Sequence, residues 1–245
     1  MKEPMTETMA DGPGVTPRQP GLLARVVGVI FSPRETFAAV VARPTWFSVL
    51  AVAVLISGVA QFALLSTELG QQMALDQQVS AAEAFGITIS DEAYAAMEQQ
   101  MENARFTGPI GTMVFIPLVL AMSAGILHMM FGLIGGGNGT FKQVYAISAH
   151  SAIVSSLQIV FTTLVTLAAG RAAGANLAVF APTLEDTTFV YKLLSYIDLF
   201  YVWSTFVTAV GLAVLYKRRT SPIAMVLFSI YLVFAAIFAF ATSGS

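Results

Sequence analysis

The sequence predicts an all-α integral membrane protein, built as a bundle of five transmembrane helices with a cytoplasmic amphipathic N-terminal segment and an external helical loop. Hydrophobic residues make up 56% of the chain and charged residues only 11%, whereas a soluble domain carries about 25% charge. Three long stretches contain no charged residue at all. Basic residues are grouped in blocks between the apolar stretches, as in multi-pass membrane proteins.

The remaining composition excludes several classes of function. There are 12 Lys+Arg against 14 Asp+Glu, so no net basic field favours binding to nucleic acid. The chain has no cysteine, which excludes disulfide scaffolds, thiolate metal sites and cysteine nucleophiles. The sequence also predicts no cofactor.

The five spans follow from the length of the apolar stretches, since a helix needs about 20 apolar residues to cross the hydrocarbon core. Three stretches are free of charge: Pro44 to Thr67, Phe106 to Phe141 and Gln143 to Gly170. A fourth, Phe189 to Tyr216, contains Lys192 and Asp198, and a fifth starts at Thr220. We expect a transmembrane domain over residues 44–245, with spans near 46–67, 110–134, 143–169, 189–216 and 221–242. Residues 172–184 are too few to cross and predict a loop or an interfacial segment.

The positions of lysine and arginine predict the orientation, because positive segments resist translocation. Nine of them fall before the first span or in the links between spans two and three and between spans four and five: Lys2, Arg18, Arg25, Arg34, Arg43, Lys142, Lys217, Arg218 and Arg219. The loop after span one is acidic instead. We therefore expect a cytoplasmic N-terminus, an external C-terminus and no cleaved signal peptide.

The segments outside the lipid are expected to be helical. Residues 1–20 are predicted to be a disordered tail, and residues 21–43 to form two amphipathic helices at the inner membrane face, the second opened by a capping box of Ser32 and Glu35. These helices would anchor the first span or dock a partner. The external loop, residues 68–109, predicts two short helices joined around Gly86, with Ser90 at the start of the second. This loop would form a lid over the bundle or bind a partner.

Polar side chains recur every three or four residues in spans three and four, which places them on one side of each helix. Because hydrogen bonds between helices recover about 0.6 to 2 kcal/mol in lipid, the two polar faces should meet inside the bundle. We expect Asp198 to face Gln158 or Thr162. The cluster either ties helices together or lines a polar cavity or pathway. Its candidate residues are Asp198, Gln158, Thr162, Ser155, Tyr201 and Thr205.

His128 and His150 form a weaker candidate pair. They lie eleven residues on either side of Gly139, so an antiparallel hairpin would place them at the same depth. The turn between them, residues 135–139, is glycine-rich, and we expect Gly137 and Gly139 to need positive φ angles. No third metal ligand is evident, so no metal site is predicted. The residue constellations of intramembrane proteases and hydrolases are not found either, which predicts a protein that is not an enzyme.

Two segments carry a resemblance to a family. The run from Arg25 to Phe37, followed by Arg43-Pro-Thr-Trp46, resembles the opening of bacterial members of the YIP family, which are polytopic proteins named for eukaryotic relatives that interact with Ypt/Rab GTPases. The run Gly139-Thr-Phe-Lys-Gln-Val-Tyr145 is similar to a Phe-Lys-Gln run that follows a glycine-rich turn in such proteins. The resemblance implies a five-helix fold and a non-enzymatic role. The link of the eukaryotic members to vesicle traffic does not carry over to a bacterium.

The sequence thus favours a structural or accessory protein of the bacterial inner membrane, with membrane lipids, other membrane proteins or a second copy of itself as partners, and no nucleic acid. The rival hypothesis is a small transporter or channel that moves a solute or protons past Asp198. An odd number of helices without an inverted repeat weakens that rival.

Overall fold

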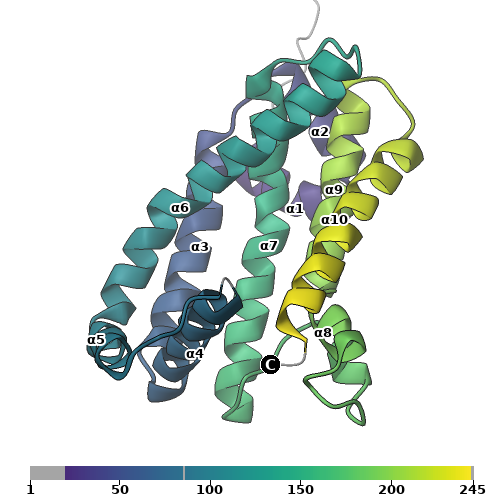
Figure 1. Ribbon diagram of the computed structural model, residues 1–245. Helices are drawn as coiled ribbons and strands as arrows, with labels where there is room; N and C mark the ends of the chain where they lie inside the picture. The colour runs from purple at the N-terminus through teal and green to yellow at the C-terminus, as the bar shows by residue number, and fades with distance from the viewer. Residues whose placement is uncertain (1–19, 85, 244–245) are drawn as a thin grey trace, which may run out of the picture.

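The structure is a computed structural model that describes residues 20–84 and 86–243 (Figure 1). The long helices are α3 (Phe47–Leu65), α6 (Ala104–Leu127), α7 (Phe141–Ala169), α9 (Leu199–Leu215) and α10 (Thr220–Thr242), and a π-helical segment, η1 (His128–Ile134), continues α6. The shorter helices are α1 (Leu22–Phe31), α2 (Pro33–Ala42), α4 (Glu68–Ala84), α5 (Asp91–Met101), the 3-10 helix η2 (Leu177–Phe180) and α8 (Phe189–Ser195). The predicted tail lies, apart from Pro20, outside the described residues.

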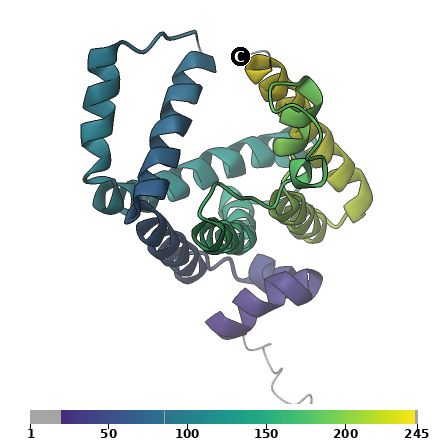
Figure 2. The same cartoon turned by 90° about the horizontal axis from the view of Figure 1, so that it is seen from below.

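Helix α7 is the centre of the bundle. It packs against α3, α6 and α9, and α10 packs on the far side of α9; Figure 2 shows α7 between α3 and α9. Four helical segments of the described chain are long and apolar enough to cross a membrane: α3, α6 with η1, α7 and α10. They correspond to the first, second, third and fifth predicted spans, although α6 starts at Ala104, earlier than expected.

The fourth predicted span is not one helix. Residues 189–216 form α8 and α9, and the chain leaves the helical conformation between them at residues 196–198. Asp198 has extended backbone angles and is the N-cap of α9, so the expectation that it lies within a helical span is wrong. At this position the carboxylate can accept hydrogen bonds from the free backbone N–H groups at the start of a helix. In a helix interior these N–H groups are already bonded within the helix. Helix α9 has 17 residues, a length of about 26 Å.

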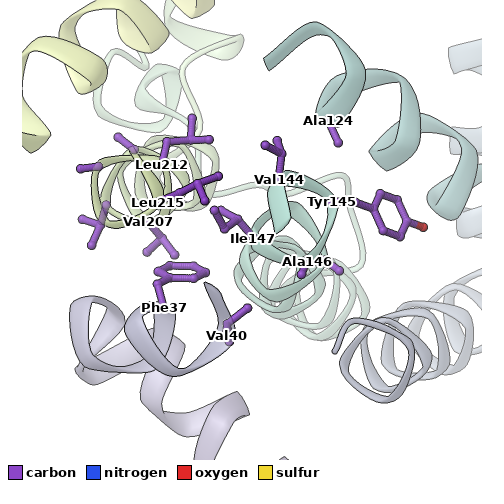
Figure 3. Close-up of a cluster of buried hydrophobic side chains, with 14 of the residues drawn as sticks. Phe37, Val40, Ala124, Val144, Tyr145, Ala146, Ile147, Val207, Leu212 and Leu215 are labelled. Carbon is purple, nitrogen blue, oxygen red and sulfur yellow. The ribbon is translucent and has the colours of Figure 1, made fainter. Parts of the chain in front are cut away.

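The N-terminal helices α1 and α2 bury side chains against the helices of the bundle. The side chains of Val29, Phe37 and Val40 are fully buried, and α2 contacts both α7 and α9. Figure 3 shows the Phe37 ring of α2 among side chains of α7 and α9. Residues 21–43 contain two helices, but the predicted capping box at Ser32 is absent, because the Ser32 side chain makes no cap hydrogen bond. The Ser32 carbonyl oxygen accepts a hydrogen bond from Thr36 Oγ1 at 3.0 Å.

The segment between α3 and α6, predicted to be an external loop, contains the two predicted helices, α4 and α5. Gly86 between them has φ +74°, a conformation that glycine adopts at no steric cost. As expected, Ser90 is the N-cap of α5, and its hydroxyl accepts a hydrogen bond from the Ala93 amide at 3.2 Å. Leu75 and Met101 bury their side chains in a small apolar cluster with the end of α3 and the start of α6. This cluster fixes the loop helices to one end of the bundle.

The glycine-rich turn between η1 and α7 is tight for a different reason from the predicted one. The positive φ angle, +67°, belongs to Gly136, and neither Gly137 nor Gly139 has one. Those two glycines are close to the side chains of Tyr216 and Leu215 at the end of α9, where a Cβ on either glycine would clash. They are therefore needed for close packing between the turn and α9.

Candidate functional site

Asp198 is held at the start of α9 by hydrogen bonds to both carboxylate oxygens. Its Oδ1 accepts from the backbone amides of Phe200 at 2.8 Å and Tyr201 at 3.2 Å, and its Oδ2 accepts from Gln158 Nε2 of α7 at 3.2 Å. Only 7% of the residue is exposed. The predicted pairing of Asp198 with Gln158 is thus present, and the carboxylate both caps α9 and ties it to α7.

The backbone around the helix break is also hydrogen-bonded. The Tyr231 hydroxyl of α10 accepts from the Asp198 amide at 3.1 Å and donates to the Tyr196 carbonyl at 2.8 Å. The segment between α7 and α8 pairs with the break as an isolated antiparallel bridge: Leu177 N donates to Ile197 O at 2.9 Å, and Leu199 N to Ala175 O at 3.0 Å. Broken helices persist at membrane depth only where such partners satisfy the freed backbone groups.

The sequence did not indicate Tyr231 or the bridge. Tyr231 in the largely apolar last span was the available signal for the first, since a buried hydroxyl requires a partner. No sequence pattern indicated the bridge, because the pairing of residues 175–177 with residues 197–199 depends on the tertiary fold that brings the two segments together.

The other predicted members of the cluster lie in separate surroundings. Ser155 Oγ donates to Ser204 Oγ at 3.3 Å, a second contact between α7 and α9. The Thr162 hydroxyl is buried without a hydrogen-bond partner in the described part of the chain. The Tyr201 side chain is 48% exposed, and Thr205 is half-buried. The two polar faces therefore meet at two points, and Tyr201 contributes through its backbone amide.

A cavity of about 730 Å³ lies at the end of α7 that is close to this break. It is bounded by the end of α7, the segment that follows it and the start of α8. Its polar lining residues are Arg171, Asn176, Asp186 and Tyr191. Asn176 belongs to the bridge that pairs with Asp198, but Asp198 itself does not line the cavity.

At the opposite end of the bundle, the segments that carried the family resemblance come together. The ring of Trp46 packs edge-on against Tyr145 with centroids 5.0 Å apart. Gln143 completes a capping box with Thr140 at the start of α7, and its Nε2 donates to the Val41 carbonyl at the end of α2 at 3.0 Å. These side chains connect α2, α3 and α7, so the residues that carried the family resemblance hold these three helices together.

Arg25 of α1 is the buried cation of this region, with 7% exposure. Its guanidinium donates to Thr45 Oγ1 at 2.7 Å and to Ser48 Oγ at 3.2 Å. The hydrogen bonds attach α1 to the start of α3.

The two histidines have different environments. His150 is fully buried, its Nδ1 lies 2.7 Å from the Ala146 carbonyl oxygen, and its ring meets the edge of Phe37. His128 lies in η1, where a Cβ on Gly132 would lie 2.9 Å from the His128 Nδ1 and 3.2 Å from the Tyr216 hydroxyl oxygen. Within residues 20–84 and 86–243, no group of three or more potential metal ligands is present.

The comparisons with known proteins agree with the resemblance. The family model of the Yip1 domain matches residues 27–242, from within α1 to the end of α10. No curated protein and no solved structure gives a significant match. A match over this share of the chain, together with the four apolar helices, identifies a membrane protein, and the chain belongs to the Yip1 domain family.

Proposed function

We propose that the protein is a non-enzymatic integral membrane protein with a structural or accessory role, which binds other membrane proteins or lipids. The proposal rests on the hydrogen bonds that the Asp198 carboxylate accepts. Its two carboxylate oxygens are occupied by three hydrogen bonds from α7 and α9, an arrangement that serves helix capping and packing rather than chemistry on a ligand.

The exposure of α6 supports the same proposal and indicates the binding surface. Only 6% of the most apolar stretch of α6 with η1 is buried inside the chain, against 44% for α3. Its outward side chains include Val114, Leu118 and Met122, each more than half exposed. Because the rest of the chain buries so little of this apolar helix, its exposed side can contact lipid tails or helices of another membrane protein.

Photo-crosslinking in native membranes tests this assignment. A photoreactive residue at position 114, 118 or 122 is expected to give adducts with lipid or with a membrane protein. The same residue at the buried positions 50 and 54 of α3 is expected to give crosslinks within the chain only. Adducts of equal yield from both sets would contradict the assignment of α6 as the binding surface.

We further propose five crossings in a bacterial inner membrane, with α8 and α9 together making the fourth. Arg34 of α2, Lys142 in the first turn of α7 and the three basic residues between α9 and α10 (Lys217, Arg218 and Arg219) support a cytoplasmic location for that end of the bundle. Figure 1 shows these three segments at one end and α4, α5 and α8 at the other. The N-terminus is then cytoplasmic and the C-terminus external.

Single introduced cysteines test the topology, because the chain has none of its own. Positions 76, 98, 34 and 218 are all exposed. An impermeant thiol reagent should label positions 76 and 98 in intact cells, and positions 34 and 218 only after the membrane is opened. External labelling at position 218 would refute the five-crossing arrangement.

A second candidate function is a small transporter or channel that uses Asp198, because the cavity reaches Asn176, which forms a backbone bridge with Asp198. Proteoliposomes with an entrapped pH-sensitive dye separate the two functions. For an accessory protein, the wild type and Asp198→Asn are expected to leave proton and cation permeability at the level of protein-free vesicles. A flux that the wild type supports and Asp198→Asn abolishes would establish the transporter instead.

A further inference from the structure

Two neighbouring cavities lie between α2 and α9 at the end of the bundle that we assign to the cytoplasm. The first, of about 360 Å³, is lined by Arg34, Ala38, Ala213, Val214, Lys217 and Arg218. The second, of about 280 Å³, shares Arg34 with it and adds the start of α2, Phe206, Val210 and Thr220. We refer to these two adjacent cavities together as the basic groove, since Arg34 of α2 lines both and Lys217 and Arg218, which follow α9, line the first.

The charges in this groove are not neutralised by the described part of the chain. Arg218 donates a hydrogen bond to the Gly135 carbonyl oxygen, which leaves its positive charge uncompensated. The side chains of Arg34 and Lys217 form no ion pair within residues 20–84 and 86–243. Glu35 is the one acid among the described lining residues, and it borders only the second cavity. Three cations against one acid attract an anion.

Lys217, which lines the groove, has an unfavourable left-handed backbone conformation. Helix α9 ends in a Schellman motif, in which the Arg218 amide donates to the Ala213 carbonyl at 2.9 Å. Lys217 occupies the left-handed position of that motif with φ +51°, where glycine is usual. A residue without a side chain would end the helix more favourably. The strained lysine is consistent with a function for its charge.

The walls of the groove are apolar, which discriminates between anions. Ala38, Ala213 and Val214 line the first cavity, and Phe206 and Val210 line the second. Phe31, just before α2, is 79% exposed, as expected of a side chain that dips into the membrane interface. A basic rim above an apolar wall fits a molecule with an anionic head and a hydrocarbon tail.

We propose that this groove binds an anionic phospholipid of the inner leaflet, with the phosphate held by Arg34, Lys217 and Arg218 and an acyl chain lying along Phe206 and Val210. Basic pockets between helices at the cytoplasmic face attract such headgroups. This inference rests on the proposed non-enzymatic, binding function and names one ligand class for it.

Native mass spectrometry of the full-length protein in a neutral detergent tests the proposal. Phosphatidylglycerol and phosphatidylcholine with identical acyl chains are offered together. The wild type should retain phosphatidylglycerol preferentially. The double variant Arg34→Gln/Lys217→Gly should bind it less tightly, by about fivefold for each basic charge removed.

Two controls separate loss of binding from loss of fold or of bulk charge. Lys217→Gly alone relieves the left-handed strain, so its melting temperature without lipid should equal or exceed that of the wild type while its preference for phosphatidylglycerol falls. Lys142→Gln removes an exposed charge at the same end of the bundle but outside the groove, and should leave the preference unchanged.

Three outcomes would overturn the proposal. These are an unchanged preference in the double variant, an equal loss in Lys142→Gln, and displacement of the lipid by glycerol 3-phosphate at equal concentration, which would mark a site for free phosphate. If the preference is absent but α6 still crosslinks to lipid or protein in the membrane, only this inference fails. If both are absent, the proposed binding function fails with it.

Discussion

Asp198→Leu is expected to lower the free energy of unfolding by about 2 to 4 kcal/mol, measured as reversible unfolding in mixed micelles. Leucine removes the N-cap of α9, which is worth about 0.5 to 2 kcal/mol. It also leaves the amide of Gln158, at present 3.2 Å from Asp198 Oδ2, without its acceptor, which costs about 1 to 3 kcal/mol for a buried group. Asp198→Asn should change the free energy of unfolding by less than about 1 kcal/mol, because asparagine caps helices as well as aspartate does.

A double-mutant cycle assigns the loss to the contact between α7 and α9. In the background of Gln158→Leu, the further change Asp198→Leu should cost less than it does in the wild type, by about 0.5 to 1.5 kcal/mol. Ser90→Ala is a matched control, since Ser90 caps α5 with one hydrogen bond in the segment between α3 and α6. Its effect should be about 1 kcal/mol. An Asp198→Leu protein as stable as the wild type would remove the structural role on which the proposed function depends.

Replacement of both Gly137 and Gly139 by valine is expected to destabilise the protein by about 2 to 6 kcal/mol, or to prevent its accumulation in the membrane, because overpacking costs about 1 to 3 kcal/mol at each site. A Cβ on Gly139 would lie 2.8 Å from Tyr216 Cε1 and 2.9 Å from Leu215 Cδ2. A Cβ on Gly137 would lie 2.7 Å from the Phe131 carbonyl oxygen. The turn would have to move away from the end of α9.

Single alanine variants distinguish packing from backbone strain at this turn. Gly139→Ala should destabilise through contact with Tyr216. Gly136→Ala has open space around its Cβ and should lose only about 1 to 2 kcal/mol, from the left-handed backbone. Gly111→Ala in α6 also has open space and should be neutral or stabilising by about 0.5 to 1 kcal/mol. Equal effects of Gly136→Ala and Gly139→Ala in thermal unfolding would contradict the packing explanation.

The sequence by itself determined the features that depend on composition and local pattern. Long charge-free stretches must be helical in lipid, where every backbone polar group needs an internal partner, so α3, α7 and α10 could be placed closely. The Ser90 cap and the Gly86 turn followed from local chemistry. The spacing of polar residues in spans three and four was enough to predict the pairing of Asp198 with Gln158. Polar side chains are costly in lipid unless they form hydrogen bonds between helices, so two polar helix faces pack against each other.

Only the tertiary structure decided where that pattern is interrupted. The break before Asp198 requires partners for its backbone, and these come from Tyr231, 33 residues further along the chain, and from the bridge at Asn176. Packing against Tyr216 likewise explains Gly137 and Gly139, and the meeting of α2 with the end of α9 creates the basic groove around Arg34. Each feature joins segments distant in sequence, and periodicity within one helix says which side is polar but not which distant group lies opposite.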